Sequence, residues 1–174
     1  MIIPCKAIGT IESAFVDPLG SARQARIDGR GGRIVLKQEY QEGLDGLEGF
    51  SHIIALYYFH KESEEHLKVK PLFDPEKCHG IFACRFPSRP NRLGISILTL
   101  NGIENNILYC SDIDMLNGTP VLDIKPYVKQ FDHITETKSG WYDEVDWANC
   151  EHYVTPNTAP AATEARHGER ILPR

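Results

Sequence analysis

Three arginines on a proline-containing stretch are the first residues of this sequence whose type and spacing could do chemistry. Arg85, Arg89 and Arg92 follow one another between residues 85 and 94, with two prolines and no acidic residue among them. Proline fixes φ and removes a backbone donor, so such a loop is rigid. Guanidinium groups held on a rigid loop suit the binding of a carboxylate or a phosphate. The alternative interpretation is a charged surface loop that binds nothing.

A second stretch combines a tight turn with a carboxylate on the strand that follows it. Residues 117–120, Asn-Gly-Thr-Pro, have the composition of a turn with exposed backbone groups, which suits a flat polar ligand. Asp123 alternates with apolar neighbours, so we expect its side chain to point away from the core. A carboxylate that only caps the turn is the alternative.

The motifs of several common sites are absent from the sequence. No GxGxxG motif joins a strand to a helix, and the glycines of residues 29–32 fall in a predicted hairpin loop, so a dinucleotide fingerprint is unsupported. The chain carries no P-loop, HExxH or GxSxG motif. Its seven histidines show no ligand spacing and its five cysteines form no CxxC pair. The sequence therefore predicts neither a metal site nor a disulfide framework.

Nothing in the sequence points to a membrane or to secretion. No run approaches the ~20 apolar residues of a membrane span. The apolar start is too short, and too soon interrupted by Pro4, to be a signal peptide. A reducing cytoplasm is the simplest setting for scattered cysteines. We therefore expect a cytoplasmic protein with no membrane partner.

Charge is unevenly distributed along the chain. The net charge of −5 argues against wholesale nucleic-acid binding, which usually needs a basic face. Between residues 20 and 37, however, five basic residues stand against one acidic residue. Because an acidic protein can still present a local basic patch, this predicted hairpin could contact phosphates. A solvated charged face is the alternative.

Short strands separated by turns account for most of the chain. Apolar alternation and runs of β-branched and aromatic residues predict strands at residues 8–15, 24–27, 33–37, 52–59, 80–84, 95–100, 107–110 and 120–124. The run 52–59 is almost continuously apolar, so we expect burial on both of its faces. A short helix is expected from residue 38 to residue 46. This pattern predicts a mainly β fold, a small closed or nearly closed β-barrel with a few short helices.

The composition changes after Asp132. We expect one domain over residues 1–132, followed by a C-terminal extension and an irregular tail over residues 133–174. Within the extension, Trp141–Trp147 has the pattern of a packed amphipathic segment. It could serve a dimer contact or simply cap the barrel.

Four motifs in this order along the chain resemble the TsaA-like family, which includes TrmO-type tRNA N6-methyltransferases. The resemblance covers roughly residues 7–131. The motifs are Ile8-Gly9 through Arg23-Gln24, residues 46–52 through 59–60, the arginine stretch of residues 85–94, and residues 117–127.

The resemblance implies a small β-barrel that binds S-adenosyl-L-methionine, usually as a homodimer. It also implies methyl transfer to the N6 nitrogen of threonylcarbamoyladenosine at position 37 of tRNA. The cofactor contacts that it implies are Ala22, Arg23, Gln24, His60, Lys61, Arg85, Leu93, Gly94, Asn117, Gly118, Thr119 and Pro120.

Catalysis on such a nitrogen needs a proton acceptor. The lone pair of an exocyclic adenine nitrogen is delocalised, so a carboxylate or carbonyl must hold its N–H group and take the proton. Asp123 is our first candidate for this role and Asp114 our second, with Lys125 and Tyr127 steering the modified base. For substrate binding we expect Arg89 and Asn91, with Arg89 and Arg85 holding a ligand carboxylate or the RNA backbone, and phosphate contacts from Arg26, Arg30 and Arg33.

Two alternatives stay open. Ala22, Arg92 and Asn117 differ from the residues common at these places in the family. The protein could therefore hold S-adenosylmethionine as a sensor without transferring the methyl group. It could also methylate a small molecule, which the acidic net charge favours and the basic hairpin disfavours.

Overall fold

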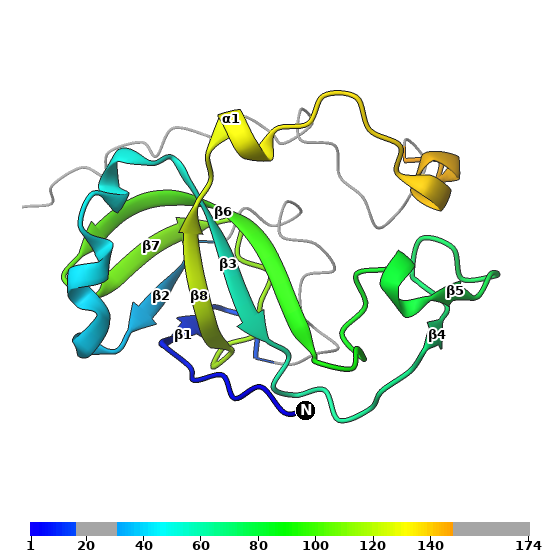
Figure 1. Ribbon diagram of the computed structural model, residues 1–174, viewed down its shortest axis with the longest axis horizontal. Helices are drawn as coiled ribbons and strands as arrows, with labels where there is room; N and C mark the ends of the chain where they lie inside the picture. The colour runs from blue at the N-terminus through cyan, green and yellow to red at the C-terminus, as the bar shows by residue number, and fades with distance from the viewer. Residues whose placement is uncertain (17–30, 148–174) are drawn as a thin grey trace, which may run out of the picture.

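The protein is built around a closed barrel of six antiparallel strands, with a small lobe beside it (Figure 1). The computed structural model describes residues 1–16 and 31–147. The strands run in the order β1-β2-β7-β6-β3-β8, and pairing of β1 with β8 closes the barrel. They are β1 (Gly9–Glu12), β2 (Gly32–Leu36), β3 (His52–Tyr58), β6 (Leu93–Glu104), β7 (Ile107–Ser111) and β8 (Pro120–Pro126). The prediction of a mainly β fold with a closed barrel is confirmed.

Each barrel strand buries one face. In β3, Ile53, Ala55 and Tyr57 are buried, whereas the residues between them are only partly covered. Side chains alternate across a strand, so a barrel wall has one inner and one outer face. The expectation that residues 52–59 are buried on both faces is therefore wrong. The inner faces form a single apolar core whose fully buried side chains include Ile11, Ile34, Leu98, Leu108 and Val121.

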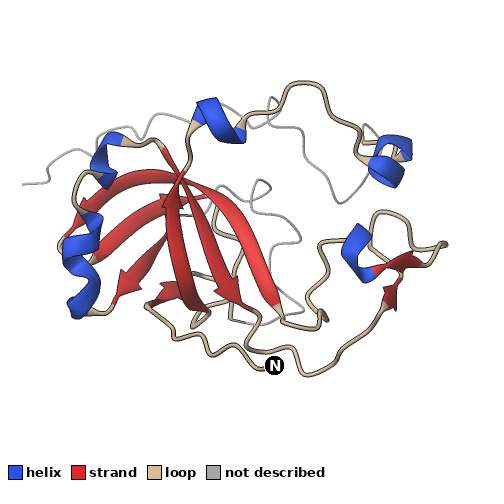
Figure 2. Cartoon of the chain, in the orientation of Figure 1, coloured by secondary structure: helices blue, strands red, loops and turns tan. Residues whose placement is uncertain are grey.

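Short helices follow the strands. The 3-10 helices η1 (Gln38–Leu44) and η2 (Leu47–Gly49) occupy the region where the sequence predicts a helix, and they bury Leu44 and Leu47. After β8 come α1 (Lys129–Asp132) and the 3-10 helix η4 (Gly140–Glu144). Figure 2 shows how little helix there is beside the strands. No helix within the described ranges is long and apolar enough to cross a membrane.

The small lobe consists of β4 (Lys68–Val69), β5 (His79–Gly80), the 3-10 helix η3 (Ile81–Ala83) and the chain around η4. Its own apolar cluster contains Val69, Ile81 and Cys84, with Phe86 and Trp141 packed against them. The predicted strand at residues 80–84 is wrong beyond Gly80. Ile81 and Cys84 both face this cluster, and a 3-10 turn brings residues three apart to the same side, which an extended strand does not.

The two long hairpin strands are as predicted, with one extension. The predicted strands at residues 95–100 and 107–110 lie within β6 and β7, which pair with each other from Thr99 onward, and β6 runs from Leu93 to Glu104 with an irregularity after Leu100. The predicted strand at residues 24–27 lies outside the described residues. The boundary predicted after residue 132 stays a prediction, although Trp141, beyond that boundary, packs on the small lobe.

Candidate functional site

A cavity of about 610 Å³ opens beside the first half of β6, between the barrel and the arginine-bearing loop. Of the described strands, only β3 pairs with residues 93–98 of β6, because β7 joins β6 from Thr99 onward. One edge of β6 therefore faces this cavity. We call it the arginine cavity; its lining is Tyr57, Phe59, Phe82, Cys84, Arg85, Arg89, Leu93, Gly94, Ile95, Ser96, Ile97, Asp112 and Asp114.

A partly buried carboxylate lies at the barrel side of the arginine cavity. Ser96 Oγ donates to Asp114 Oδ1 at 3.2 Å, and Tyr57 Oη lies 3.1 Å from the same Ser96 oxygen. Burial raises the pKa of Asp114, and the Ser96 hydrogen bond opposes part of that shift. Burial also raises the pKa of the Tyr57 hydroxyl, with a further contribution from the Asp114 charge. The chain thus holds a desolvated carboxylate in a fixed orientation.

The three arginines have different environments. Arg85 is exposed and lines the cavity. Arg89 donates from Nη1 to the carbonyls of Ile81 at 3.1 Å and Cys84 at 2.6 Å. Arg92 turns the other way, donating to the Ser63 carbonyl at 3.0 Å and the Tyr58 hydroxyl at 3.3 Å. Arg85 is therefore the arginine best placed to receive an anion in the cavity.

The turn at residues 117–120 lies against His60. Thr119 Oγ1 is 3.4 Å from His60 Nδ1, and Gly118 has a φ of 81°, the left-handed conformation that favours glycine. Burial, followed by the nearby Lys61, lowers the pKa of His60, which favours the neutral imidazole. Because Phe59 lines the arginine cavity and His60 touches the turn, these consecutive residues connect the two segments that the sequence singled out.

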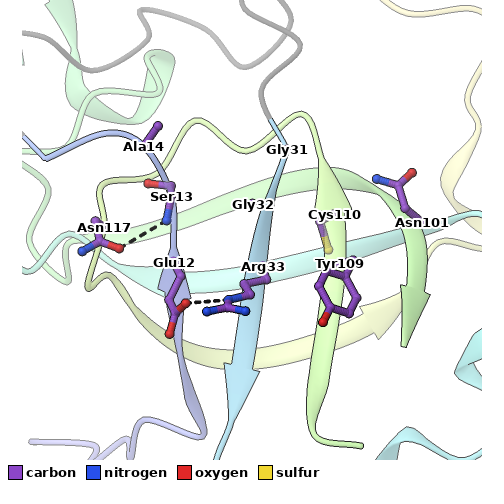
Figure 3. A pocket seen from close by; sticks show the side chains of 10 residues that line it. All are labelled: Glu12, Ser13, Ala14, Gly31, Gly32, Arg33, Asn101, Tyr109, Cys110 and Asn117. Carbon is purple, nitrogen blue, oxygen red and sulfur yellow. Dashed lines mark hydrogen bonds and ion pairs between the residues drawn. The ribbon is translucent and has the colours of Figure 1, made fainter. Parts of the chain in front are cut away.

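Figure 3 shows a second, more open cavity of about 590 Å³ over β1 and β2. It contains two of the predicted site residues. Asn117 Oδ1 accepts from the Ser13 backbone at 3.2 Å, and Arg33 Nε lies 2.6 Å from Glu12 Oε2. The Arg33–Glu12 pair is about half exposed, so its charge is largely in water.

The three predicted catalytic residues lie on β8 or directly after it, outside the arginine cavity. Asp123 is 46% exposed and pairs with Lys125 at 2.7 Å. Asp123 lies opposite Leu56 of β3, and Tyr127 donates its backbone N–H to the His52 carbonyl at the far end of that strand. None of the three lines either described cavity.

The remaining predicted contacts divide into three groups. Leu93 and Gly94 line the arginine cavity, whereas Lys61 and Asn91 are exposed. Ala22, Arg23, Gln24, Arg26 and Arg30 lie outside the described residues. In the described part of the chain, no three His, Cys, Asp or Glu side chains gather as metal ligands would.

Sequence reasoning missed several residues of the cavity. Tyr57 and Ser96 looked like ordinary strand residues, and only the pairing of β3 with β6 brings them to Asp114. Phe82 is 78% exposed and lies 5.9 Å from the Arg89 guanidinium, measured to the ring centroid. An apolar residue so close to the arginine stretch was the available signal.

Known proteins resemble this chain over most of its length. The family model of the tRNA-methyltransferase O N-terminal domain matches residues 10–133. A probable S-adenosyl-L-methionine-binding protein of Pyrococcus abyssi is 42% identical over 145 residues, which cover 83% of this chain and 78% of that protein. The human tRNA (adenine(37)-N6)-methyltransferase is 36% identical over 160 residues, covering 87% of this chain and only 35% of the human protein.

A solved structure shares the fold. The crystal structure of TrmO from Pseudomonas aeruginosa superposes with a TM-score of 0.66 at 34% sequence identity. The superposition covers 80% of this chain and 62% of that chain. The chain thus spans less than two thirds of the solved protein and about a third of the human one.

Proposed function

The chain belongs to the family of the tRNA-methyltransferase O N-terminal domain, and on that premise we propose that it binds S-adenosyl-L-methionine and methylates N6 of adenosine 37 in tRNA. The family match also confirms the TsaA-like resemblance drawn from the sequence. The observation that carries the proposal is the presence of Arg85 and the partly buried Asp114 in one cavity.

The arginine cavity fits this cofactor in size and in chemistry. Its volume of about 610 Å³ lies in the range of small-molecule sites. S-adenosylmethionine has a carboxylate, an ammonium, a sulfonium and a flat nucleoside, and when bound it supplies an activated methyl group. Arg85 offers a guanidinium for the carboxylate, and Phe82 and Leu93 offer apolar surface for the nucleoside.

Asp114 is the proposed proton acceptor. When bound, the cofactor would supply the methyl group with cleavage of its methyl–sulfur bond, and the N6 proton would have to be taken up as the N–C bond forms. Asp114 would hold the N6–H group and take this proton, while Ser96 keeps the carboxylate in place. Asp114 takes precedence over Asp123 in this proposal because Asp123 is paired with Lys125 outside the cavity.

We further propose that the acceptor is threonylcarbamoyladenosine and that the protein acts in the cytoplasm as a homodimer. The threonyl carboxylate of that nucleoside is an anion that Arg89 or Asn91 could bind. Lys125 and Tyr127 remain candidates for steering tRNA along the outer wall.

The dimer is supported by the outward apolar residues Leu93, Ile95 and Ile97, which are 44%, 55% and 53% exposed on one strand.

A binding protein without methyl transfer is the second candidate. It is favoured by the name of the Pyrococcus relative, which mentions binding and no reaction. A sensor would need the cofactor contacts of Arg85 but no proton acceptor at Asp114.

The test uses the full chain and S-adenosylmethionine with a deuterated methyl group. Two tRNA substrates are compared, one carrying unmethylated threonylcarbamoyladenosine and one carrying plain adenosine at position 37. Mass spectrometry of the digested nucleosides should find the labelled methyl on threonylcarbamoyladenosine alone. Transfer to plain adenosine would refute the proposal that the acceptor is threonylcarbamoyladenosine. If calorimetry detected cofactor binding but neither tRNA were methylated, the result would favour a protein that binds the cofactor without transferring its methyl group.

A further inference from the structure

The C-terminal segment of residues 139–147 contacts the loop that carries Arg85. This segment lies beyond the residues 10–133 that the family model matches. It contains η4, and its aromatic residues stack on the small lobe. The Trp141 ring stacks on His79 at 4.4 Å and on Tyr142 at 3.8 Å between centroids. His79 is in turn fixed by Asp74 at 2.9 Å, in a pair that is mostly buried.

Three side-chain hydrogen bonds hold the backbone of η3 and the residue after it. Arg89 donates to the carbonyls of Ile81 and Cys84, and Trp141 Nε1 donates to the carbonyl of Ala83 at 2.9 Å. The lobe has little other regular structure, because β4 and β5 are two residues long each. A two-stranded sheet of that size is marginal by itself, so these side-chain bonds matter for the order of the loop.

The peptide group between Cys84 and Arg85 is held through its carbonyl oxygen, which accepts from Arg89 Nη1 at 2.6 Å. One residue earlier, the Ala83 carbonyl accepts from Trp141 Nε1 at 2.9 Å, and the Tyr142 ring stacks on the Trp141 ring at 3.8 Å between centroids. Fixing this peptide plane fixes the direction in which the Arg85 side chain leaves the backbone.

We propose that Trp141 and Tyr142 are positioning residues, which hold Arg85 toward the arginine cavity and so make cofactor affinity depend on the C-terminal segment. The proposal rests on the proposed function for the identity of the ligand. Neither residue lines the cavity, so Trp141 acts through the backbone of residues 83–85 and Tyr142 acts through its stacking on the Trp141 ring.

The test separates positioning from general stability. Trp141→Phe keeps a ring that can stack on His79 but loses the donor to Ala83, and Tyr142→Ala removes the ring that stacks on Trp141. Glu144→Gln is the matched control, because Glu144 belongs to the same segment and forms only an exposed ion pair with Lys77 at 3.6 Å. Each variant is measured in the full chain by calorimetric titration with S-adenosylmethionine and by thermal unfolding.

A double-mutant cycle with Arg85→Ala decides whether the effect passes through that side chain. Loss of the Trp141 hydrogen bond should weaken the cofactor affinity of Trp141→Phe by roughly tenfold, Tyr142→Ala should weaken it in the same direction, and Glu144→Gln should leave it unchanged. In the Arg85→Ala background the same substitutions should change the affinity by less than about twofold. An equal loss in both backgrounds would overturn the proposal.

Hydrogen exchange of the ligand-free protein gives a readout that does not depend on the cofactor. The Cys84 amide, which donates to the Ile81 carbonyl at 3.2 Å, should exchange faster in Trp141→Phe than in the parent chain and in Glu144→Gln. Unchanged exchange in Trp141→Phe would overturn the proposed positioning. If the parent chain bound no S-adenosylmethionine, the proposed function would fail, while the exchange data would still decide how Arg85 is held.

Discussion

Asp114 combines two properties that seldom occur together on a side chain near the surface. It is largely shielded from water, and it accepts a hydrogen bond from Ser96 that fixes its direction. A carboxylate in water is too weak a base to compete for a proton at neutral pH, and burial moves its pKa upward. This combination is what a proton acceptor requires.

Substitution of Asp114 should separate catalysis from binding. Asp114→Asn should lower the rate of methyl transfer about 10²- to 10⁴-fold with a much smaller change in cofactor affinity. The parent enzyme should gain activity as the pH rises through the raised pKa of Asp114, and this acidic limb should vanish in the variant. Rates measured from pH 4 upward check this. Asp123→Asn is the control; loss of the limb in that variant instead would return the role to Asp123.

The same group should carry a cost in stability. Because burial raises the pKa of Asp114 above its ordinary value of 3.8, the folded protein binds more protons than the unfolded chain between the two pKa values. Stability is therefore lost as the pH rises through that interval, and the full penalty is present at neutral pH. Asp114→Asn should melt at a higher temperature than the parent at pH 7. The difference should disappear below the ordinary pKa, and a constant difference at all pH values would contradict this origin.

Residue types could be predicted from the sequence better than their positions. The arginine stretch predicted a role for Arg85, which lines the arginine cavity, because prolines and adjacent cations can be read locally. Alternation also placed Asp123 off the core, and it is half exposed. Alternation reports which face of a strand a residue occupies but not which end of the barrel it reaches. The choice between Asp114 and Asp123 depends on the pairing of β3, β6 and β8, which are distant in the sequence.

At the scale of elements, the close pairing of β3 with β6 forms the barrel side of the cavity. Gly94 lies opposite Tyr57 in this pairing, and a Cβ atom at Gly94 would come within 2.2 Å of the Tyr57 ring. The ring has little freedom to move, because its hydroxyl meets Ser96 and its edge meets Phe59 at 5.4 Å between centroids.

Gly94→Ala should therefore destabilise the barrel. We expect a loss of about 1–3 kcal/mol in the free energy of unfolding, the usual cost of overpacking a core. Urea denaturation of the full chain measures it. Gly102→Ala is the matched control on the same strand, because a Cβ atom there meets nothing within 4 Å. Equal stability of the two variants would show that Tyr57 yields more easily than its contacts indicate.

Elements whose pattern is local were predictable, and elements fixed by distant contacts were not. Two apolar runs on either side of a polar turn predict the hairpin of β6 and β7. The stretch from His79 to Cys84 carries the same apolar composition, yet it becomes a 3-10 turn because Trp141, some 60 residues later, and Arg89 take up its carbonyls. No local pattern contains that information.

For the whole molecule, RNA binding is limited by charge, because both the chain and its proposed tRNA substrate are negatively charged. A net charge of −5 gives no general attraction, so any contacts with phosphates must come from local groups. Arg33 is the candidate for such a contact that the sequence predicts within the described residues, and Glu12 at 2.6 Å already balances its charge in part.

Affinity for tRNA should fall steeply with salt concentration. If Arg33 contacts a phosphate, Arg33→Ala should weaken binding and reduce the slope of log affinity against log salt by about one. Filter binding over a range of salt concentrations measures both. Arg33→Lys keeps the charge and should keep the slope. A slope near zero in the parent chain would show that the predicted hairpin of residues 24–37 does not contact RNA.

Composition anticipated the class of molecule but not its division into parts. The closed barrel follows from many short strands, since closure satisfies strand edges that would otherwise be open. The small lobe could not be foreseen, because its apolar cluster joins residues 69–86 to Trp141 across the whole of β6, β7 and β8.

Three outward-facing side chains of β6 could make ligand binding depend on protein concentration. Leu93, Ile95 and Ile97 are outward residues of β6 and at the same time part of the wall of the arginine cavity. A second copy of the chain that covered these three side chains would also cover the cavity. Dimer formation and ligand binding would then be linked, so that dilution of the protein would by itself weaken ligand binding.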